Sequence, residues 1–113
     1  MVDRFNVNNL GESMTDLERV KRNGFRIEHI KNQTLEIRLE AVKQDGFALF
    51  YMKKQTPEIC MEAVKQNGYA LRHVKNQTPE ICIEAVRQNI KAKKHIRIPL
   101  TEEIRNEILF QTI

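Results

Sequence analysis

The chain has 113 residues, of which 41% are hydrophobic and 30% charged, so it is long enough for one domain with one modest core. Its formal net charge of +4 at pH 7 is compatible with an acidic partner but lies far below the extreme basicity of a dedicated nucleic-acid binder. No run approaches the ~18 apolar residues of a membrane span, and the first residues lack the pattern of a secretory signal, so we expect a soluble, cytoplasmic protein without membrane contact.

An internal repeat organises most of the chain. Placing Gln33, Gln55 and Gln77 in one column aligns three copies of equal length without gaps, and a fourth, more divergent copy precedes them. The copies are residues 11–32, 33–54, 55–76 and 77–98, and residues 1–10 are predicted to be an N-terminal leader. Self-similarity at a fixed spacing of this size is typical of stacked supersecondary units.

Each copy carries the signals of two short helices. In residues 55–76 the sequence Thr-Pro-Glu begins at Thr56, which favours a helix start because the hydroxyl can accept a backbone N–H and proline suits the first helical position. Asn-Gly then ends the helix, and we expect Gly68 to take the left-handed conformation that follows many helices. A shorter second helix is predicted from Tyr69 to Lys75. Helices this short are marginal alone in water, so stacking of the copies has to supply the core.

The last copy and the segment after it depart from this pattern. Ile90 stands where the other copies have glycine, and Lys91 and Lys93 replace apolar residues. The prediction is that the two helices of this copy fuse into one and expose a basic face. Residues 99–113 resemble the first half of another copy, displaced by one residue, and we interpret them as a capping helix. The predicted fold is therefore all-α, a short α-solenoid of stacked helical hairpins.

The residues that most often carry chemistry are sparse. Cys60 and Cys82 share a column, but helices that pack ~8–10 Å apart hold them beyond the ~7 Å Cα separation that a disulfide bridges, so we expect reduced thiols. The only serine is Ser13, and no spacing orients a nucleophile beside a base. No catalytic residue, enzymatic activity or cofactor is predicted.

One column of the second helix contains His29, Tyr51, His73 and His95. Ligands ~10 Å apart on stacked helices cannot converge on one ion whose bonds to nitrogen are ~2.0 Å long, so no metal site is predicted. Two interpretations of this column stay open. Its rings pack between the copies, or they contact a partner.

Two further columns are entirely basic. The first, on the first helix, lies three residues after a glutamate in every copy, so we expect ion pairs within each helix; it comprises Lys21, Lys43, Lys65 and Arg87. The second, placed on the second helix, continues into the lysines of the last copy. Its candidate phosphate-binding residues are Lys31, Lys53, Lys75, Lys91, Lys94 and Arg97. Such a basic ridge would bind nucleic acid, although ordinary solubilising charge is the simpler interpretation.

Phe50 is an apolar residue in a column that otherwise carries Glu28, Arg72 and Lys94. Next to Tyr51, it has the character of a hot spot for a protein partner. The predicted partner-binding surface comprises Phe50, Tyr51, Arg72, His29, His73 and His95.

The motif QTPEICxEAVKQNGxAL, which begins at Gln55, closely resembles a helical repeat family known only as a domain of unknown function. That family is abundant in giant viruses and also occurs in bacteria, their phages and protists. The resemblance covers roughly residues 15–98. It implies a helical repeat and a viral or phage origin, and it transfers no role to any residue.

These observations favour a non-catalytic binding module that acts through protein–protein interaction. One concrete form of this hypothesis is a phage or viral inhibitor of a host defence protein. Nucleic-acid binding through the basic ridge is the first alternative, and self-association through the ends of the stack is the second. The sequence leaves the identity of the partner and the oligomeric state open.

Overall fold

A computed structural model describes residues 14–113 of the chain; the predicted leader and the start of the first copy lie outside this part. Within residues 14–113 there is no strand. The α-helices are α1 (Asp16–Arg22), α2 (Leu35–Gln44), α3 (Pro57–Gln66), α4 (Pro79–Gln88) and α5 (Glu102–Thr112). The 3-10 helices that alternate with them are η2 (Gly24–His29), η3 (Gly46–Tyr51), η4 (Gly68–His73) and η5 (Ile90–His95).

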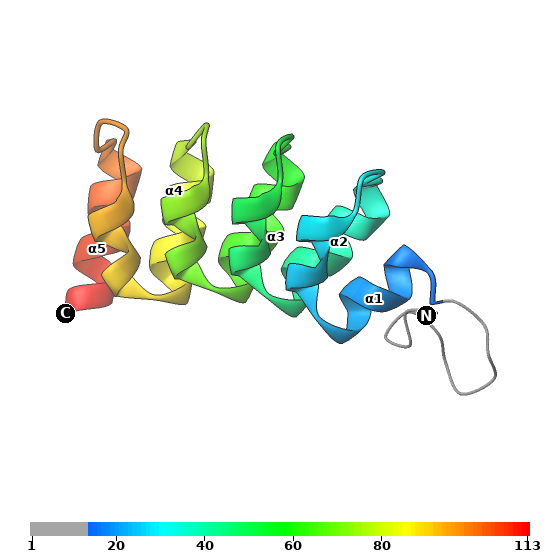
Figure 1. The fold of residues 1–113 in the computed structure, drawn as a ribbon. Coiled ribbons are helices and arrows are strands. Elements are labelled where there is room, and N and C mark those ends of the chain that lie inside the picture. The colour runs from blue at the N-terminus through cyan, green and yellow to red at the C-terminus, as the bar shows by residue number, and fades with distance from the viewer. Residues whose placement is uncertain (1–13) are drawn as a thin grey trace.

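The α-helices stand side by side in one row, and the 3-10 helices form a second row packed against it (Figure 1). Each element contacts only its neighbours along the stack, which gives an elongated body with extents of 56 × 25 × 18 Å. The prediction of an all-α stack of helical repeats is confirmed.

The predicted start signal operates at every α-helix of the described chain. In α3, the hydroxyl of Thr56 accepts a hydrogen bond from the backbone N–H of Ile59 at 3.2 Å, and Pro57 occupies the first helical position. The other capping threonines are Thr15, Thr34, Thr78 and Thr101. Each cap satisfies one of the backbone donors that a helix start leaves free.

The helix end differs from the prediction. Asn67, not a left-handed glycine, closes α3 in an extended conformation (φ −154°, ψ 112°), and its side chain accepts from the N–H of Tyr69 at 3.0 Å to begin η4. Gly68 is required for a different reason: a Cβ atom there would lie 2.5 Å from the carbonyl oxygen of Ala85 in the next unit. The same relation holds between Gly46 and Ala63. Glycine therefore allows neighbouring units to approach closely.

The second helix of each unit is a six-residue 3-10 helix, shorter and more tightly wound than predicted. A 3-10 helix has three residues per turn, so residues three apart share a face. Gly68, Leu71 and Val74 follow this spacing and are all buried. The last unit follows the same course, because Asn89 is extended and accepts from the N–H of Lys91 at 2.9 Å. The predicted fusion of α4 with the helix after it is therefore wrong.

The core lies between the two rows of helices and runs the length of the stack. In the unit that contains α3, it includes Ile59, Ala63 and Val64 from the α-helix and Leu71 and Val74 from the η4 segment, all fully buried. Because each unit buries its apolar residues against the next, no unit has a complete core of its own.

Candidate functional site

Aromatic rings join neighbouring 3-10 helices along one face of the stack. The residue after each glycine packs edge-to-face on the last residue of the next 3-10 helix. These pairs, called the aromatic ladder below, are Phe25 with Tyr51, Phe47 with His73, and Tyr69 with His95, with ring centroids 6.0, 5.7 and 6.0 Å apart. Edge-to-face pairs of aromatic rings contribute about 0.5–1.5 kcal/mol beyond the burial of their area. The ladder therefore links the units in addition to the apolar core.

Phe50 lies outside the regular ladder and connects two of its pairs. Its ring centroid is 5.1 Å from that of Tyr51 and 5.1 Å from that of His73, yet 63% of the residue is exposed. Around it is an open depression of about 320 Å³, called the aromatic depression below. It is lined by Phe25, Phe47, Phe50, Tyr51, Arg72 and His73.

The structure brings together only some of the residues predicted to bind a partner. Phe50, Tyr51, Arg72 and His73 meet at the aromatic depression. His29 lies one unit away, where its Nε2 is 3.7 Å from a carboxylate oxygen of Glu28. His95 lies toward the other end of the stack, packed on Tyr69, over whose ring the Lys94 ammonium sits at 5.7 Å.

Sequence reasoning missed the phenylalanines that complete this surface. Phe25 and Phe47 were assigned no role in binding, although they and Tyr69 form a column of their own directly after the glycines. Each contacts the last residue of the 3-10 helix in the following unit. The available signal was an aromatic column that precedes the histidine column in the first three copies, whereas the last copy has Lys91 there.

Two histidines of the ladder are held toward their neutral form. Burial lowers the pKa of His73, and the positive charge of Arg72 lowers it further. Burial also lowers the pKa of His95, with a second contribution from Lys94. The ladder therefore contains neutral rings at neutral pH.

We expect the protein to become less stable as the pH falls through about 6.5, the range in which histidines of an unfolded chain take up protons. Because the folded pKa values of His73 and His95 are lower, the unfolded state binds more protons in this window, and the free energy of unfolding decreases. Urea denaturation at about pH 7.5 and about pH 5.5 measures this decrease. The carboxylates of Glu18 and Glu107 titrate below this window, because hydrogen bonds lower their pKa.

The matched control is the double variant His73→Gln with His95→Gln. It is expected to show a smaller loss of stability between the two pH values, whatever its absolute stability. An equal loss in the wild type and in this variant would contradict the assignment.

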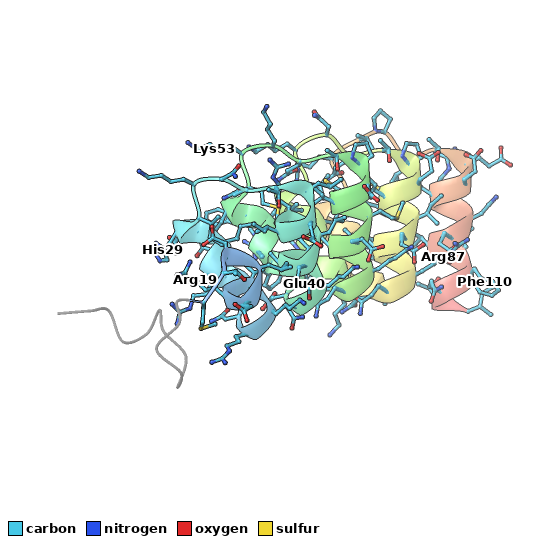
Figure 2. All side chains as sticks on the ribbon, turned by 90° about the vertical axis from the view of Figure 1, so that its right-hand side faces the viewer. Arg19, His29, Glu40, Lys53, Arg87 and Phe110 are labelled. Carbon is cyan, nitrogen blue, oxygen red and sulfur yellow. The ribbon has the colours of Figure 1, made fainter. Side chains whose placement is uncertain are left out.

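Most of the second basic column does not lie on the second helix as predicted. Lys31, Lys53, Lys75 and Arg97 are in the connecting segments that follow the 3-10 helices, whereas Lys91 and Lys94 lie on η5. Figure 2 shows Lys53 at this edge of the stack. Two of its members extend back along the stack to backbone carbonyls. Lys75 donates to the carbonyl of Lys53 at 3.4 Å, and the guanidinium of Arg97 donates to those of Arg72 and Val74. Part of the predicted ridge thus links successive connecting segments.

The first basic column also differs from its prediction. Within the described residues, Lys21, Lys43 and Lys65 make no ion pair with the glutamates three positions before them. Arg87 pairs with Glu107 of the next helix, at 3.0 Å between Nε and Oε1. Glu18 instead completes the capping box of α1 with Thr15.

The two cysteines are buried in the core and free, as predicted. Burial raises the pKa of each thiol to about 11, which keeps both protonated at neutral pH. Across residues 14–113, no three His, Cys, Asp or Glu side chains are grouped closely enough to hold a metal ion. No helix in the same range has the length and apolar character needed to cross a membrane.

One family model matches the chain twice. It describes a domain of unknown function, DUF4116, and its matches cover residues 34–78 and 56–96, which together span more than half of the chain. The chain belongs to this family. The two DUF4116 matches begin at Thr34 and Thr56, which occupy the same position in successive copies of the repeat. DUF4116 is described only as a domain of unknown function, so membership assigns no role to the residues described above. No curated protein and no solved structure gives a significant match.

Proposed function

We propose that the protein is a non-catalytic binding module that recognises another protein through the aromatic depression. The observation that carries this proposal is the exposure of Phe50: 63% of the residue is accessible although its ring contacts two others. The column of Phe50 is charged in the other units, so the packing of the repeat does not require an aromatic residue there.

The surroundings of Phe50 favour a protein partner. Residues that dominate binding energy are enriched in aromatic side chains and arginine, and Tyr51, His73 and Arg72 surround Phe50. The ladder holds Tyr51 and His73 in place before binding, which reduces the conformational entropy that association costs. The concrete form of the proposal is a viral or phage inhibitor that occupies a host defence protein. The resemblance to a repeat family of giant viruses and phages motivates it.

The experiment is an affinity capture from lysate of the native cell, with and without nuclease, followed by measurement of affinity for the captured protein. Phe50→Ala is expected to weaken this affinity by roughly tenfold or more, because loss of a hot-spot side chain costs about 2 kcal/mol. The variant also loses the two ring contacts of Phe50, so some loss of stability is expected, and the affinities are compared at a temperature at which circular dichroism shows both proteins folded.

Leu109→Ala is the matched control, because Leu109 is equally exposed (61%) but lies on α5, away from the depression. It is expected to leave the affinity unchanged. The proposal fails if Phe50→Ala and Leu109→Ala bind the partner as the wild type does.

Two alternatives make predictions that differ from those of the protein-binding proposal. Nucleic-acid binding by the basic ridge predicts that the captured material disappears after nuclease treatment and that affinity falls steeply with salt.

Self-association is favoured by the apolar residues that α5 exposes, with Leu109 61% and Phe110 73% accessible. It predicts that sedimentation depends on protein concentration, and there Leu109→Ala would have the effect.

A further inference from the structure

The glutamines that begin two of the repeats, Gln55 and Gln77, fasten one connecting segment to the next. The side-chain amide of Gln77 donates to the carbonyls of Leu71 and His95, at 3.2 and 2.9 Å. Its Oε1 accepts from the N–H of Arg97 at 2.8 Å and lies 3.6 Å from the thiol of Cys82. Gln55 makes the equivalent four contacts one unit earlier. We call this arrangement the glutamine clamp.

The clamp is open at the junction between η2 and η3. Gln33 keeps the bond to the preceding unit, to the carbonyl of Ile27 at 3.1 Å, but makes none to η3 or the segment after it. The column of Cys60 and Cys82 contains Arg38 in this unit. Arginine is far larger than cysteine and cannot occupy the space beside the glutamine in the same way.

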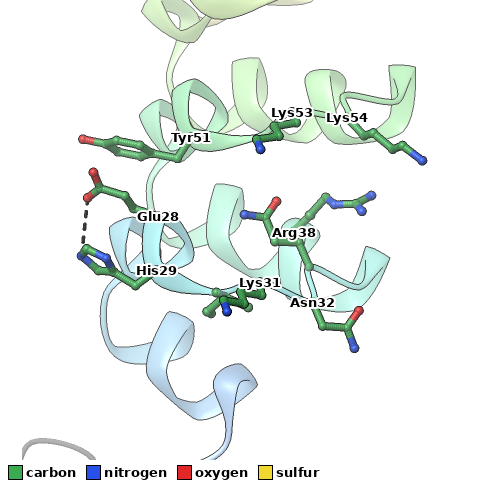
Figure 3. A pocket seen from close by; sticks show the side chains of 10 residues that line it. Glu28, His29, Lys31, Asn32, Arg38, Tyr51, Lys53 and Lys54 are labelled. Carbon is green, nitrogen blue, oxygen red and sulfur yellow. Dashed lines mark ion pairs between the residues drawn. The ribbon is translucent and has the colours of Figure 1, made fainter.

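A depression of about 650 Å³ lies at this open junction, and we call it the junction pocket. Its cationic lining residues are Lys31, Arg38, Lys53 and Lys54, opposed by the single carboxylate of Glu28. Figure 3 shows Glu28 beside His29 and Tyr51, whereas Arg38 lies among the lysines and Asn32. The positive charge is therefore concentrated on one side of the pocket.

The Nε–H of Arg38 lacks a hydrogen-bond acceptor. Its Nε is buried and has no hydrogen-bond partner, and its guanidinium makes no ion pair with any residue from 14 to 113. A buried donor without a partner costs about 1–3 kcal/mol, and more when the group is charged. Arg19 also has a buried, unpartnered Nε, but its guanidinium pairs with Asp16. Arg38 lacks such a neutralising carboxylate.

We propose that the junction pocket binds a phosphorylated small molecule, with the guanidinium of Arg38 as the central ligand of a phosphate group. A guanidinium fork matches two phosphate oxygens and neutralises one negative charge of the ligand. The ammonium groups of Lys31, Lys53 and Lys54 neutralise its further negative charges. The volume exceeds that of a single phosphate, which fits a diphosphate or a phosphate ester. The junction pocket and the aromatic depression share Tyr51 in their linings, but Arg38 and the three lysines line only the junction pocket, so this proposal does not depend on the function proposed for the depression.

The test uses inorganic pyrophosphate and the full chain, with binding measured by isothermal titration calorimetry at low ionic strength. Saturable binding of one pyrophosphate per chain is expected. Arg38→Cys, which installs the residue that α3 and α4 carry, is expected to weaken binding roughly tenfold or more, because a charge-assisted hydrogen bond contributes about 1.5–3 kcal/mol. It should fold at least as stably as the wild type, since cysteine fits beside the glutamine in two other units.

Two further variants keep the result decisive. Lys53→Gln with Lys54→Gln alters only exposed side chains and is also expected to weaken binding. Lys65→Gln removes one exposed charge on α3 outside the pocket and is expected to leave binding unchanged. The proposal is overturned if pyrophosphate does not saturate, if Arg38→Cys binds as the wild type does, or if Lys65→Gln weakens binding as much as Arg38→Cys.

A further titration distinguishes a phosphorylated small molecule from a nucleic acid as the ligand. A single-stranded oligonucleotide is titrated against the wild type and Arg38→Cys, with and without pyrophosphate. We expect weak oligonucleotide binding that does not depend on Arg38. Tighter binding than pyrophosphate, lost in Arg38→Cys, would assign the pocket to nucleic acid and overturn the small-molecule proposal.

Discussion

Replacing Gly68 with alanine is expected to lower the free energy of unfolding by roughly 2–4 kcal/mol. The added Cβ would lie 2.5 Å from the carbonyl oxygen of Ala85, which is backbone within α4 and cannot rotate away. Relief requires the two units to separate, which loosens the core between them. Glycine-to-alanine changes at unstrained sites stabilise proteins by about 0.4–1 kcal/mol. A loss of stability in Gly68→Ala would therefore by itself indicate a steric conflict at this position. Urea denaturation followed by circular dichroism measures this loss.

Ile90→Ala is the control for this substitution, because Ile90 stands in the glycine column of the last unit and already carries a Cβ. The residue is only partly buried, so this change is expected to cost less than Gly68→Ala. A Gly68→Ala protein as stable as the wild type would show that the units are not held together by this close approach.

Gln77→Ala is expected to destabilise the protein by about 2–4 kcal/mol, since it removes three hydrogen bonds and leaves their backbone partners without the amide. Gln33→Ala is the matched control, because Gln33 has the same place in its repeat but makes only one such bond. We expect it to cost about 1 kcal/mol or less. Thermal or urea denaturation of the two variants compares a closed clamp with an open one. Equal losses of unfolding free energy would contradict the claim that Gln77 links its junction more strongly than Gln33 links the first.

The features that were predictable from the sequence depend on residues close together in the chain. The threonine caps of α3 and α4, the proline after each and the asparagine at the end of each helix act over three or four positions, so the pattern shows them directly. The repeat then implied the stack. A 3-10 helix was harder to predict, because over six residues its period of 3.0 is difficult to separate from 3.6.

The features that were missed depend on the neighbouring unit. The reason for Gly68 is the carbonyl of Ala85, and Phe47 packs on a ring that also belongs to the next unit. The predicted surface combined residues from all four units, but a column runs along the stack axis, so its first and last members, His29 and His95, cannot reach one depression. Predicting the junction pocket would have required two observations together. One is the arginine in the cysteine column, and the other is that Gln33 does not bond to the following unit.

The open clamp also bears on how the stack comes apart. Contacts in residues 14–113 join only adjacent elements, so opening free energies add along the stack much as in a one-dimensional Ising chain. At the first junction, Gln33 does not reach η3, and Gln44 bonds to Glu40 of its own helix, whereas Gln66 bonds to the N–H of Gly46 across a junction. We therefore expect segment 15–29 to open as a separate foldon before the later repeats, which keep their amide protection. A ligand that spans this junction would raise the amide protection of segment 15–29 more than that of the later repeats.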